Sequence, residues 1–329
     1  MIETAPTYRY GDLRFWEMLP GGLVWGTFIL SILLSFVAPL WVIIFIIVFD
    51  VLWLFRVIYF VIYLFIAWRN YRRTSSILWS QRLTEIPHAQ EIYHLVFLPT
   101  YQEEVEVVRQ TLQSLSVSSY PNERLMVVLA GEQADEAHFK EVASTMTKEF
   151  GHQFKRMFIT IHPKCLPDEI PGKGSNLHWS GLQVADLLCA DYPEIRDEQI
   201  VASAFDVDTV AHVEYFAYLT YLYCTVPDPL HASYQPVALF SNNIWTATSP
   251  VRVASFGTTF WILGELARPE RLWTFSSHSM PWTMLKDVGF WEKGIVSEDS
   301  RIFMQAFVHY HGQYRVEPMF LPVSMDAVS

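Results

Sequence analysis

The sequence predicts an α/β domain with a mostly parallel sheet and helices on both faces, preceded by two transmembrane helices. Three observations lead to this fold class. No charged residue occurs from Met18 to Phe49. Only 17% of all residues are charged, against roughly 25% in soluble domains. From His94 onward, short apolar runs alternate with helical stretches, a pattern typical of parallel βαβ units.

The apolar N-terminal region is long enough for two membrane spans. As one helix, Met18–Phe49 would extend about 48 Å, whereas a bilayer core is roughly 30 Å thick. Pro39 offers a break, so we expect spans at Gly21–Ala38 and Leu40–Trp68, joined by a tight turn. The region is too long for a signal peptide and lacks a cleavage site of small residues.

Arginines on both flanks predict the orientation in the membrane. An even number of crossings puts both flanks on one side, and the positive-inside rule makes that side cytoplasmic. We therefore expect a multi-pass protein of the cell (inner) membrane with residues 74–329 in the cytoplasm. Asp50 and Arg56 fall within the second predicted span, and each either lines a polar path or is a turn-end or snorkelling residue. The flanking arginines are Arg9, Arg14, Arg69, Arg72 and Arg73.

Composition excludes several classes of protein. The formal net charge of −11 argues against a nucleic-acid partner, because phosphate binding needs a cationic surface. The three cysteines form no CxxC pair, which excludes a disulfide scaffold and a cysteine zinc site and suits a reducing compartment.

Four segments are expected along the chain: a cytoplasmic N-terminal segment (1–20), the two transmembrane helices (21–68), a connector (69–92) and a soluble α/β domain (93–329). Pro87 and a mixed polar pattern mark the connector, which has room for one amphipathic helix. Buried strands are predicted at His94–Pro99, Arg124–Ala130, Met157–His162 and Gln199–Phe205. Helices are predicted at Glu103–Leu115, Ala134–Phe150, Asn176–Cys189 and Arg301–His309.

The fourth predicted strand ends in Phe205-Asp206-Val207-Asp208, and ligands of parallel sheets bind beyond the carboxyl ends of the strands. The carboxylates of Asp206 and Asp208 are hard oxygen ligands suited to Mg²⁺ or Mn²⁺. Two carboxylates form a weak cage, so such an ion would also bind substrate phosphates. Most DxD strings are solvated turns, but the position after a buried strand favours a site.

Three further loops lie at strand ends or helix starts. In Pro99–Glu104, Thr100 can cap the following helix, and Thr100 and Tyr101 could instead face a nucleotide base. The acidic loop Gly131–Asp135 could bind a base or ribose. Pro171–Asn176 places glycines around a lysine at a helix start, which suits either an anion or an ordinary turn. It is not a P-loop, and GxGxxG is absent too.

Ser297-Glu298-Asp299 opens the last helical stretch. Ser297 is a good N-cap and the acids suit the first turn, so capping explains the triplet locally. Alternatively, one carboxylate projects into the cleft as a base near a substrate hydroxyl. His278 is a weaker candidate for substrate contact. The sequence has no HExxH or GxSxG motif.

In this order, these strings resemble the family 2 glycosyltransferases, specifically the membrane-bound branch of cellulose, hyaluronan and related polysaccharide synthases. The resemblance covers about Tyr93–Pro322. The matching strings are PTYQEE (99–104), GEQAD (131–135), GKGSN (172–176), FDVD (205–208) and SED (297–299). It implies a GT-A fold, a divalent ion, and transfer from a nucleotide sugar with inversion of the anomeric centre.

The resemblance also implies roles for single residues. Asp299 would be the general base, with Glu298 and His278 as weaker acceptor-side candidates. Asp208, with Asp206, would hold the Mg²⁺ or Mn²⁺, and the donor is expected to be a UDP-sugar. The acceptor would be a polysaccharide or glycolipid at the cytosolic face of the lipid membrane. Residues implied to bind the donor are Thr100, Tyr101, Glu103, Glu132, Lys173 and Asp206.

Two departures from the family pattern bear on these expectations. The loop at Gly131 reads AGEQ where many relatives carry paired aspartates. No QxxRW occurs, and the 329 residues contain neither that segment nor the later membrane helices of processive relatives. The chain is therefore a fragment, or this branch works without them; in the second case we expect donor binding with little long polymer. The alternatives are non-processive transfer to a lipid carrier or small acceptor, and an inactive membrane protein that binds nucleotide sugars.

Overall fold

The structure is a computed structural model that describes residues 10–327. The chain divides into two compact units, Met1–Val61 and Ile62–Ser329. Helices α1 (Tyr10–Val37) and α2 (Pro39–Thr74) are separated by Ala38 alone. Arg14–Val37 and Pro39–Thr74 are long and apolar enough to cross a membrane. The two long apolar helices and the break at Pro39 are thus confirmed; Pro39 lacks an N–H and suits the first position of a helix.

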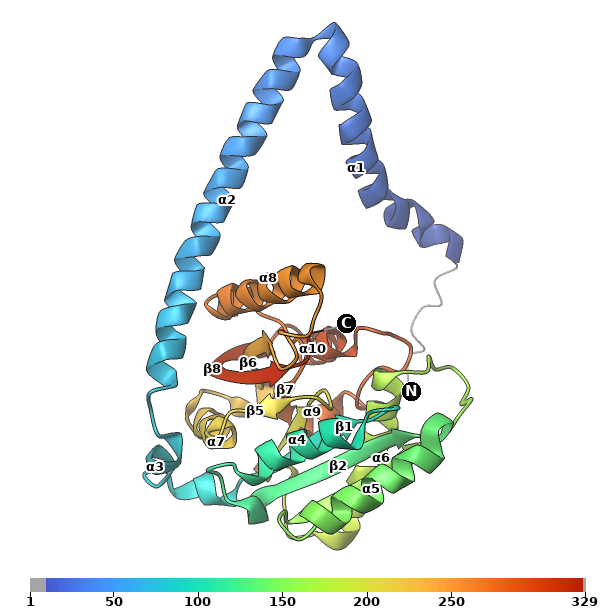
Figure 1. The fold of residues 1–329 in the computed structure, drawn as a ribbon, viewed down its shortest axis with the longest axis vertical. Helices are drawn as coiled ribbons and strands as arrows, with labels where there is room; N and C mark the ends of the chain where they lie inside the picture. Colours follow the sequence, from blue (N-terminus) through green and yellow to red (C-terminus); the bar gives the residue numbers. More distant parts are fainter. Residues whose placement is uncertain (1–9, 328–329) are drawn as a thin grey trace. The chain divides into compact units, whose positions relative to one another are not determined.

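The second unit contains an eight-stranded sheet in the order β3-β2-β1-β4-β7-β6-β8-β5 (Figure 1). The strands from β3 to β4 are parallel, while β7 runs antiparallel to both β4 and β6. β6 and β8 are parallel again, and β5 is antiparallel to β8. The strands are β1 (Tyr93–Pro99), β2 (Leu125–Glu132), β3 (Arg156–His162), β4 (Ile200–Ala204), β5 (Val210–Ala211), β6 (Ala232–Phe240), β7 (His278–Pro281) and β8 (Arg315–Met325).

Each strand and helix predicted from the sequence is present in the soluble part, with boundaries shifted by a few residues. The connector carries a helix, α3, of five residues. The helices are α3 (Trp79–Leu83), α4 (Val105–Ser116), α5 (Glu136–Phe150), α6 (Lys173–Asp191), α7 (Tyr215–Thr225), α8 (Ser249–Leu266), α9 (Trp282–Asp287) and α10 (Glu298–His309). Short 3₁₀ turns are η1 (Pro87–Glu91), η2 (Asn122–Arg124), η3 (Gln133–Asp135), η4 (Asp197–Gln199), η5 (Pro229–His231) and η6 (Pro269–Arg271).

Helices cover both faces of the sheet, as alternate residues of β1 show. Val96 and Leu98 belong to one core cluster, which also contains buried residues of α4 and α5. Leu95 and Phe97 belong to a second cluster, formed with α6, α9 and α10. A strand buried on both faces carries apolar residues at every position. The predicted α/β fold with a mostly parallel sheet and helices on both faces is confirmed.

Replacing Gly131 with alanine should destabilise the fold, because a Cβ at this position of β2 would overlap the ring of Phe139. Overpacking of a core costs about 1–3 kcal/mol, and a domain of this size loses roughly 2–4 °C in Tm per kcal/mol. Gly257→Ala is the control, since its added Cβ meets nothing within 4 Å. It should stabilise α8 by roughly 0.5–1 kcal/mol. Equal melting temperatures for the two variants would contradict this packing.

Candidate active site

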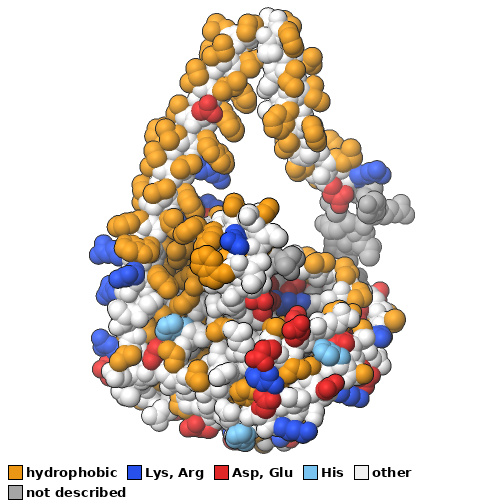
Figure 2. Space-filling model, viewed as in Figure 1, with side chains coloured by type: hydrophobic (Ala, Val, Ile, Leu, Met, Phe, Trp, Pro, Cys, Tyr) orange, Lys and Arg blue, Asp and Glu red, His pale blue; other side chains and the backbone are white. Residues whose placement is uncertain are grey.

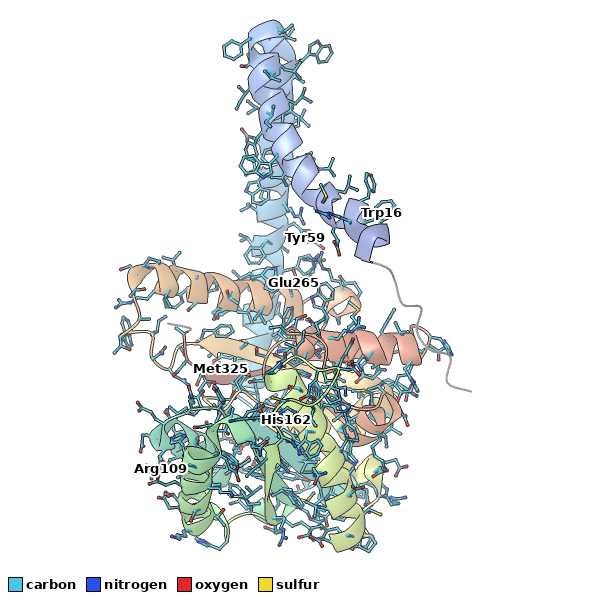
Figure 3. All side chains as sticks on the ribbon, turned by 90° about the vertical axis from the view of Figure 1, so that its right-hand side faces the viewer. Trp16, Tyr59, Arg109, His162, Glu265 and Met325 are labelled. Carbon is cyan, nitrogen blue, oxygen red and sulfur yellow. The ribbon has the colours of Figure 1, made fainter. Side chains whose placement is uncertain are left out.

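A cavity of about 790 Å³ lies at the carboxyl ends of β1, β2 and β4. This is the edge of the sheet at which the sequence placed the chemistry. Met325, labelled in Figure 3, is one of its lining residues. Seven of the predicted site residues line this one cavity: Thr100, Tyr101, Glu103, Glu132, Lys173, Asp206 and Asp208.

The loop after β4 holds Asp206 and Asp208 in place through the main chain and neighbouring hydroxyls. The backbone N–H of Asp206 donates to Ser277 Oγ (3.2 Å), and Asn242 Nδ2 donates to the carbonyl of Asp208 (3.0 Å). The Asp208 carboxylate accepts a hydrogen bond from the backbone N–H of Asp326 (2.8 Å). These hydrogen bonds hold the backbone at both aspartates and the carboxylate of Asp208.

Negative charges crowd this edge of the cavity. Burial, together with the charges of Asp206 and Asp326, raises the pKa of Asp208 to about 6. Burial and the charge of Asp326 also raise the pKa of Glu103. A divalent cation would relieve this repulsion, and carboxylate oxygens are suitable ligands for one. Within residues 10–327, however, no three His, Cys, Asp or Glu side chains are grouped closely enough to hold a metal ion. A cation bound at Asp206 and Asp208 would therefore need its remaining ligands from substrate or water.

Lys173, the first residue of α6, lies among three carboxylates from distant parts of the chain. Its Nζ is 2.6 Å from Asp206 Oδ1 and 3.3 Å from Glu298 Oε1. It donates to both oxygens of the Asp299 carboxylate at 3.0 Å. Gly172, just before it, has φ +155°, a conformation that disfavours a side chain. Glycine therefore suits this backbone conformation at the N-cap of the helix that carries the lysine.

This ion cluster controls the charge of Asp299. Burial disfavours the carboxylate, but the attraction of Lys173 outweighs it and lowers the pKa of Asp299. In turn, burial opposes the charge of Lys173, whereas Asp299, Asp206 and Glu298 raise its pKa. Both side chains are charged at neutral pH. A carboxylate with a lowered pKa is a poor proton acceptor until its partner lysine moves away.

Asp299 is positioned by the segment before β7 as well as by its own helix. Ser276 Oγ donates to Asp299 Oδ2 (3.2 Å), and Thr274 donates to the Asp299 carbonyl. His278 is fully buried, with Nδ1 bonded to the carbonyl of Phe275 and 3.9 Å from Asp299 Oδ1. His278 is therefore a buried neighbour of Asp299 and is not among the described residues that line the cavity. The Glu298 side chain is also buried, 6% exposed, against Lys173.

The capping hypothesis for Thr100 is wrong, and that for Ser297 holds for its N-cap position and the acidic first turn but not for a capping hydrogen bond. The helix after β1 begins at Val105, and Thr100 Oγ1 donates to the carbonyl of Leu98 (3.0 Å). Ser297 occupies the N-cap position of α10, but among the described residues its side chain makes no capping hydrogen bond. Its φ and ψ are −99° and 53°, which differ from the extended conformation usual at an N-cap.

His162 lies beside two glutamates, of which Glu132 lines the cavity. His162 is 3% exposed, and its Nδ1 is hydrogen-bonded to Glu132 Oε2 (2.8 Å). Its Nε2 lies 3.0 Å from Glu169 Oε1. Burial raises the pKa of Glu132, and the hydrogen bond from His162 opposes that shift. His162 is labelled in Figure 3.

Several residues around the cavity are absent from the sequence-based prediction. Asp326 directly follows β8. Ligands of such sheets bind beyond the carboxyl ends of the strands, so a prediction of β8 as a strand of this sheet would have identified Asp326. His162 was included as the last residue of a predicted strand, but Glu169 lies in a loop that no pattern marks. Ser276 and Ser277 directly precede His278, and only His278 was predicted as a candidate site residue.

The chain was compared with known proteins. No family model matches it, and no curated protein matches its sequence. Among solved structures, it is similar to the mannosyltransferase PcManGT of Pyrobaculum calidifontis, in complex with GDP-Man and Mn²⁺. The identity is 14% and the TM-score 0.46, over 81% of this chain and 68% of that one. It is also similar to residues 1–349 of S. aureus TarS in complex with UDP-GlcNAc, at 13% identity and TM-score 0.44, over 72% of this chain and 59% of that one.

Proposed function

We propose that this chain is a metal-dependent inverting glycosyltransferase of the membrane-bound family 2 type, with residues 93–329 as its GT-A domain. One observation carries the proposal: Asp206, Lys173 and Asp299 meet beside a 790 Å³ cavity that is also lined by Thr100, Glu103 and Glu132. The sequence resemblance assigns donor binding and base catalysis to these same positions.

The proposed reaction needs one base and one leaving group. The oxygen of the acceptor hydroxyl bonds to the anomeric carbon of the donor. At the same time, the proton of that hydroxyl passes to the carboxylate of Asp299. The bond from that carbon to the diphosphate oxygen breaks, and the nucleoside diphosphate leaves with the electron pair. Attack opposite the leaving group inverts the anomeric centre. The acceptor is a polysaccharide or a glycolipid.

Asp208 and Asp206 would hold the Mg²⁺ or Mn²⁺, which when bound offsets the charge that develops on the leaving diphosphate. Lys173 also controls the strength of the base Asp299 in this scheme. A diphosphate at the start of α6 competes with Asp299 for Lys173 and is also favoured by the helix dipole. Movement of Lys173 toward the phosphates frees Asp299 to accept a proton, so base strength increases when the donor is bound.

A screen of nucleotide sugars tests the proposal directly. The purified full chain in detergent is incubated with UDP- and GDP-sugars and Mn²⁺ or Mg²⁺, and release of nucleoside diphosphate is measured. We expect hydrolysis or transfer with at least one donor, and identification of the product separates polymer from glycolipid. Nucleotide-sugar binding without turnover, for every acceptor tried, would favour the inactive binding protein.

The His162–Glu132 pair predicts an effect on donor binding. His162→Phe keeps a ring beside Trp179 (centroids 6.2 Å apart) but removes the group bonded to Glu132. One hydrogen bond contributes about 0.5–1.5 kcal/mol, so donor KM should rise roughly 2–10-fold, with kcat almost unchanged. His162→Gln offers an amide donor in its place and should restore part of the affinity. A loss of kcat at unchanged KM would contradict the positioning of Glu132.

We further propose that α1 and α2 span the cell (inner) membrane and keep residues 74–329 in the cytoplasm. Cys165 and Cys189 are exposed and serve as native reporters. A membrane-impermeant maleimide should leave both unlabelled in intact cells and label them after permeabilisation. Labelling from outside intact cells would place the α/β domain on the opposite side.

A further inference from the structure

Glu169 is a buried carboxylate in a loop that is otherwise mostly exposed. Residues 163–172 connect β3 to α6, and most of them are exposed. Figure 2 shows acidic side chains of the second unit, in red, at its surface. The side chain of Glu169, in contrast, is only 6% exposed. Because a carboxylate is rarely buried without a charged or hydrogen-bonding partner, the partner of Glu169 indicates its role.

That partner is His162, the last residue of β3 (Figure 3). His162 Nε2 lies 3.0 Å from Glu169 Oε1, in an ion-pair contact whose geometry is not that of a hydrogen bond. The other ring nitrogen, Nδ1, is hydrogen-bonded to Glu132 Oε2 at 2.8 Å. The partner of one ring nitrogen sets the orientation of the other. Glu169 therefore fixes the ring that holds Glu132 at the cavity.

The backbone on both sides of Glu169 is held by neighbouring segments. The N–H of Lys164 donates to the side-chain carbonyl of Gln133 (2.8 Å), in the loop after β2. The N–H of Ile170 donates to the carbonyl of Lys293 (2.9 Å), in the loop before α10. These two hydrogen bonds and the contact with His162 tie residues 163–172 to the elements that surround the cavity.

We propose that Glu169 is a positioning residue for donor binding: it orients His162 and through it Glu132, and it holds residues 163–172 against the end of β3. The inference rests on the proposal that the cavity binds a nucleotide sugar, with Glu132 among the groups that contact it. Glu169 is not among the described residues that line the cavity, so its effect on the donor passes through His162.

The chemical step should not depend on Glu169. Lys173, at the end of the same loop, lies within 3.3 Å of the carboxylates of Asp206, Glu298 and Asp299. These contacts do not involve Glu169, so the surroundings of the base Asp299 stay the same without it. Loss of Glu169 should therefore weaken donor binding and leave kcat almost unchanged.

Glu169→Gln tests the inference because it keeps the size of the side chain and removes its charge. In the full chain with Mn²⁺, the dissociation constant of UDP or GDP should rise about 2–10-fold, as expected for one lost polar contact. Donor KM should rise in parallel. Asp168→Asn is the matched control, since it removes a carboxylate that is exposed in the same loop. Its φ of 60° suits asparagine, so both constants should match those of the wild type.

A double-mutant cycle with His162→Phe tests the route of the effect. If Glu169 acts through His162, Glu169→Gln should cause no further loss of UDP or GDP affinity in the His162→Phe chain, because residues that act together are not additive. Additive losses would overturn the inference. If melting curves show that Glu169→Gln does not fold, Glu169→Asp takes its place in the cycle. Aspartate keeps the charge but withdraws it from His162 Nε2, and the same non-additivity is expected.

Hydrogen–deuterium exchange without nucleotide gives a readout that is independent of binding. Glu169→Gln should speed exchange in residues 163–172, whereas Asp168→Asn should not. Faster exchange with unchanged nucleotide affinity would mean that Glu169 only stabilises the loop, and the inference would be wrong. If the wild type binds UDP or GDP and Glu169→Gln binds it equally well, the inference fails while the proposed function stands. If the wild-type chain binds no nucleotide or nucleotide sugar at all, the proposed function itself fails, and the role of Glu169 in donor binding fails with it.

Discussion

Asp299→Asn is expected to cut glycosyl transfer about 10²–10⁴-fold, the usual cost of removing a general base, while nucleoside diphosphate binding is retained or strengthened, because the Asp299 carboxylate no longer competes for Lys173. The proton of the acceptor moves only in the transition state, so the loss should appear in kcat rather than in donor affinity. Asparagine has the size of aspartate and can still accept the hydrogen bond from Ser276. The fold should therefore survive, which a melting curve checks.

Glu298→Gln is the matched comparison. It removes one carboxylate from the same helix turn and the same lysine, since Glu298 lies 3.3 Å from Lys173. If Asp299 is the base, Glu298→Gln should retain most of the turnover per folded molecule. If both acids only stabilise α10 and Lys173, the two variants should lose similar stability and similar activity. Near-normal turnover by Asp299→Asn, or a loss that tracks the folded fraction, would rule out Asp299 as the base.

The first half of the sheet was predictable because its strands are buried on both faces. Such strands appear as continuous apolar runs, as in His94–Pro99, and the amphipathic helices between them have clear periodicity. The second half carries weaker signals. β8 contains Pro318 and Pro322, and its pairing with β6 is irregular beside Pro236. α7 is apolar on nearly all sides, so periodicity does not distinguish it from a strand.

The sequence predicts which residues form the site, but it does not predict which of these residues contact one another. The strand-end rule brings Asp206, Asp208 and Glu132 to one edge, and the structure places all three at one cavity. The pairing of Lys173 with Asp299 joins positions 126 residues apart. It depends on the approach of α6 to α10, where an added Cβ on Gly174 would lie 3.2 Å from the Cβ of Glu298. Sequence spacing carries no information about that approach.

Asp208→Asn should abolish turnover and remove the part of nucleotide affinity that depends on Mn²⁺. The Asp208 carboxylate is held toward the cavity by the N–H of Asp326 and would lose half of its ligand capacity as an amide. Changes to outer-shell partners of metal ligands already cost about 10–100-fold in metal affinity or activity, so loss of a direct ligand should cost more. The measurement is calorimetric titration with nucleoside diphosphate in Mn²⁺ and in EDTA, with melting curves to confirm folding.

Asp326→Asn separates loss of a ligand from loss of charge. It removes a neighbouring carboxylate from the cavity but keeps the backbone N–H that binds Asp208. Because the charge of Asp326 helps to raise the pKa of Asp208, its removal should ease ionisation of Asp208 and leave Mn²⁺-dependent binding largely intact. If the two variants lose Mn²⁺-dependent affinity equally, the cation responds to the summed charge of the cavity and Asp208 is not a specific ligand. If Asp208→Asn keeps that affinity, the cation is held elsewhere.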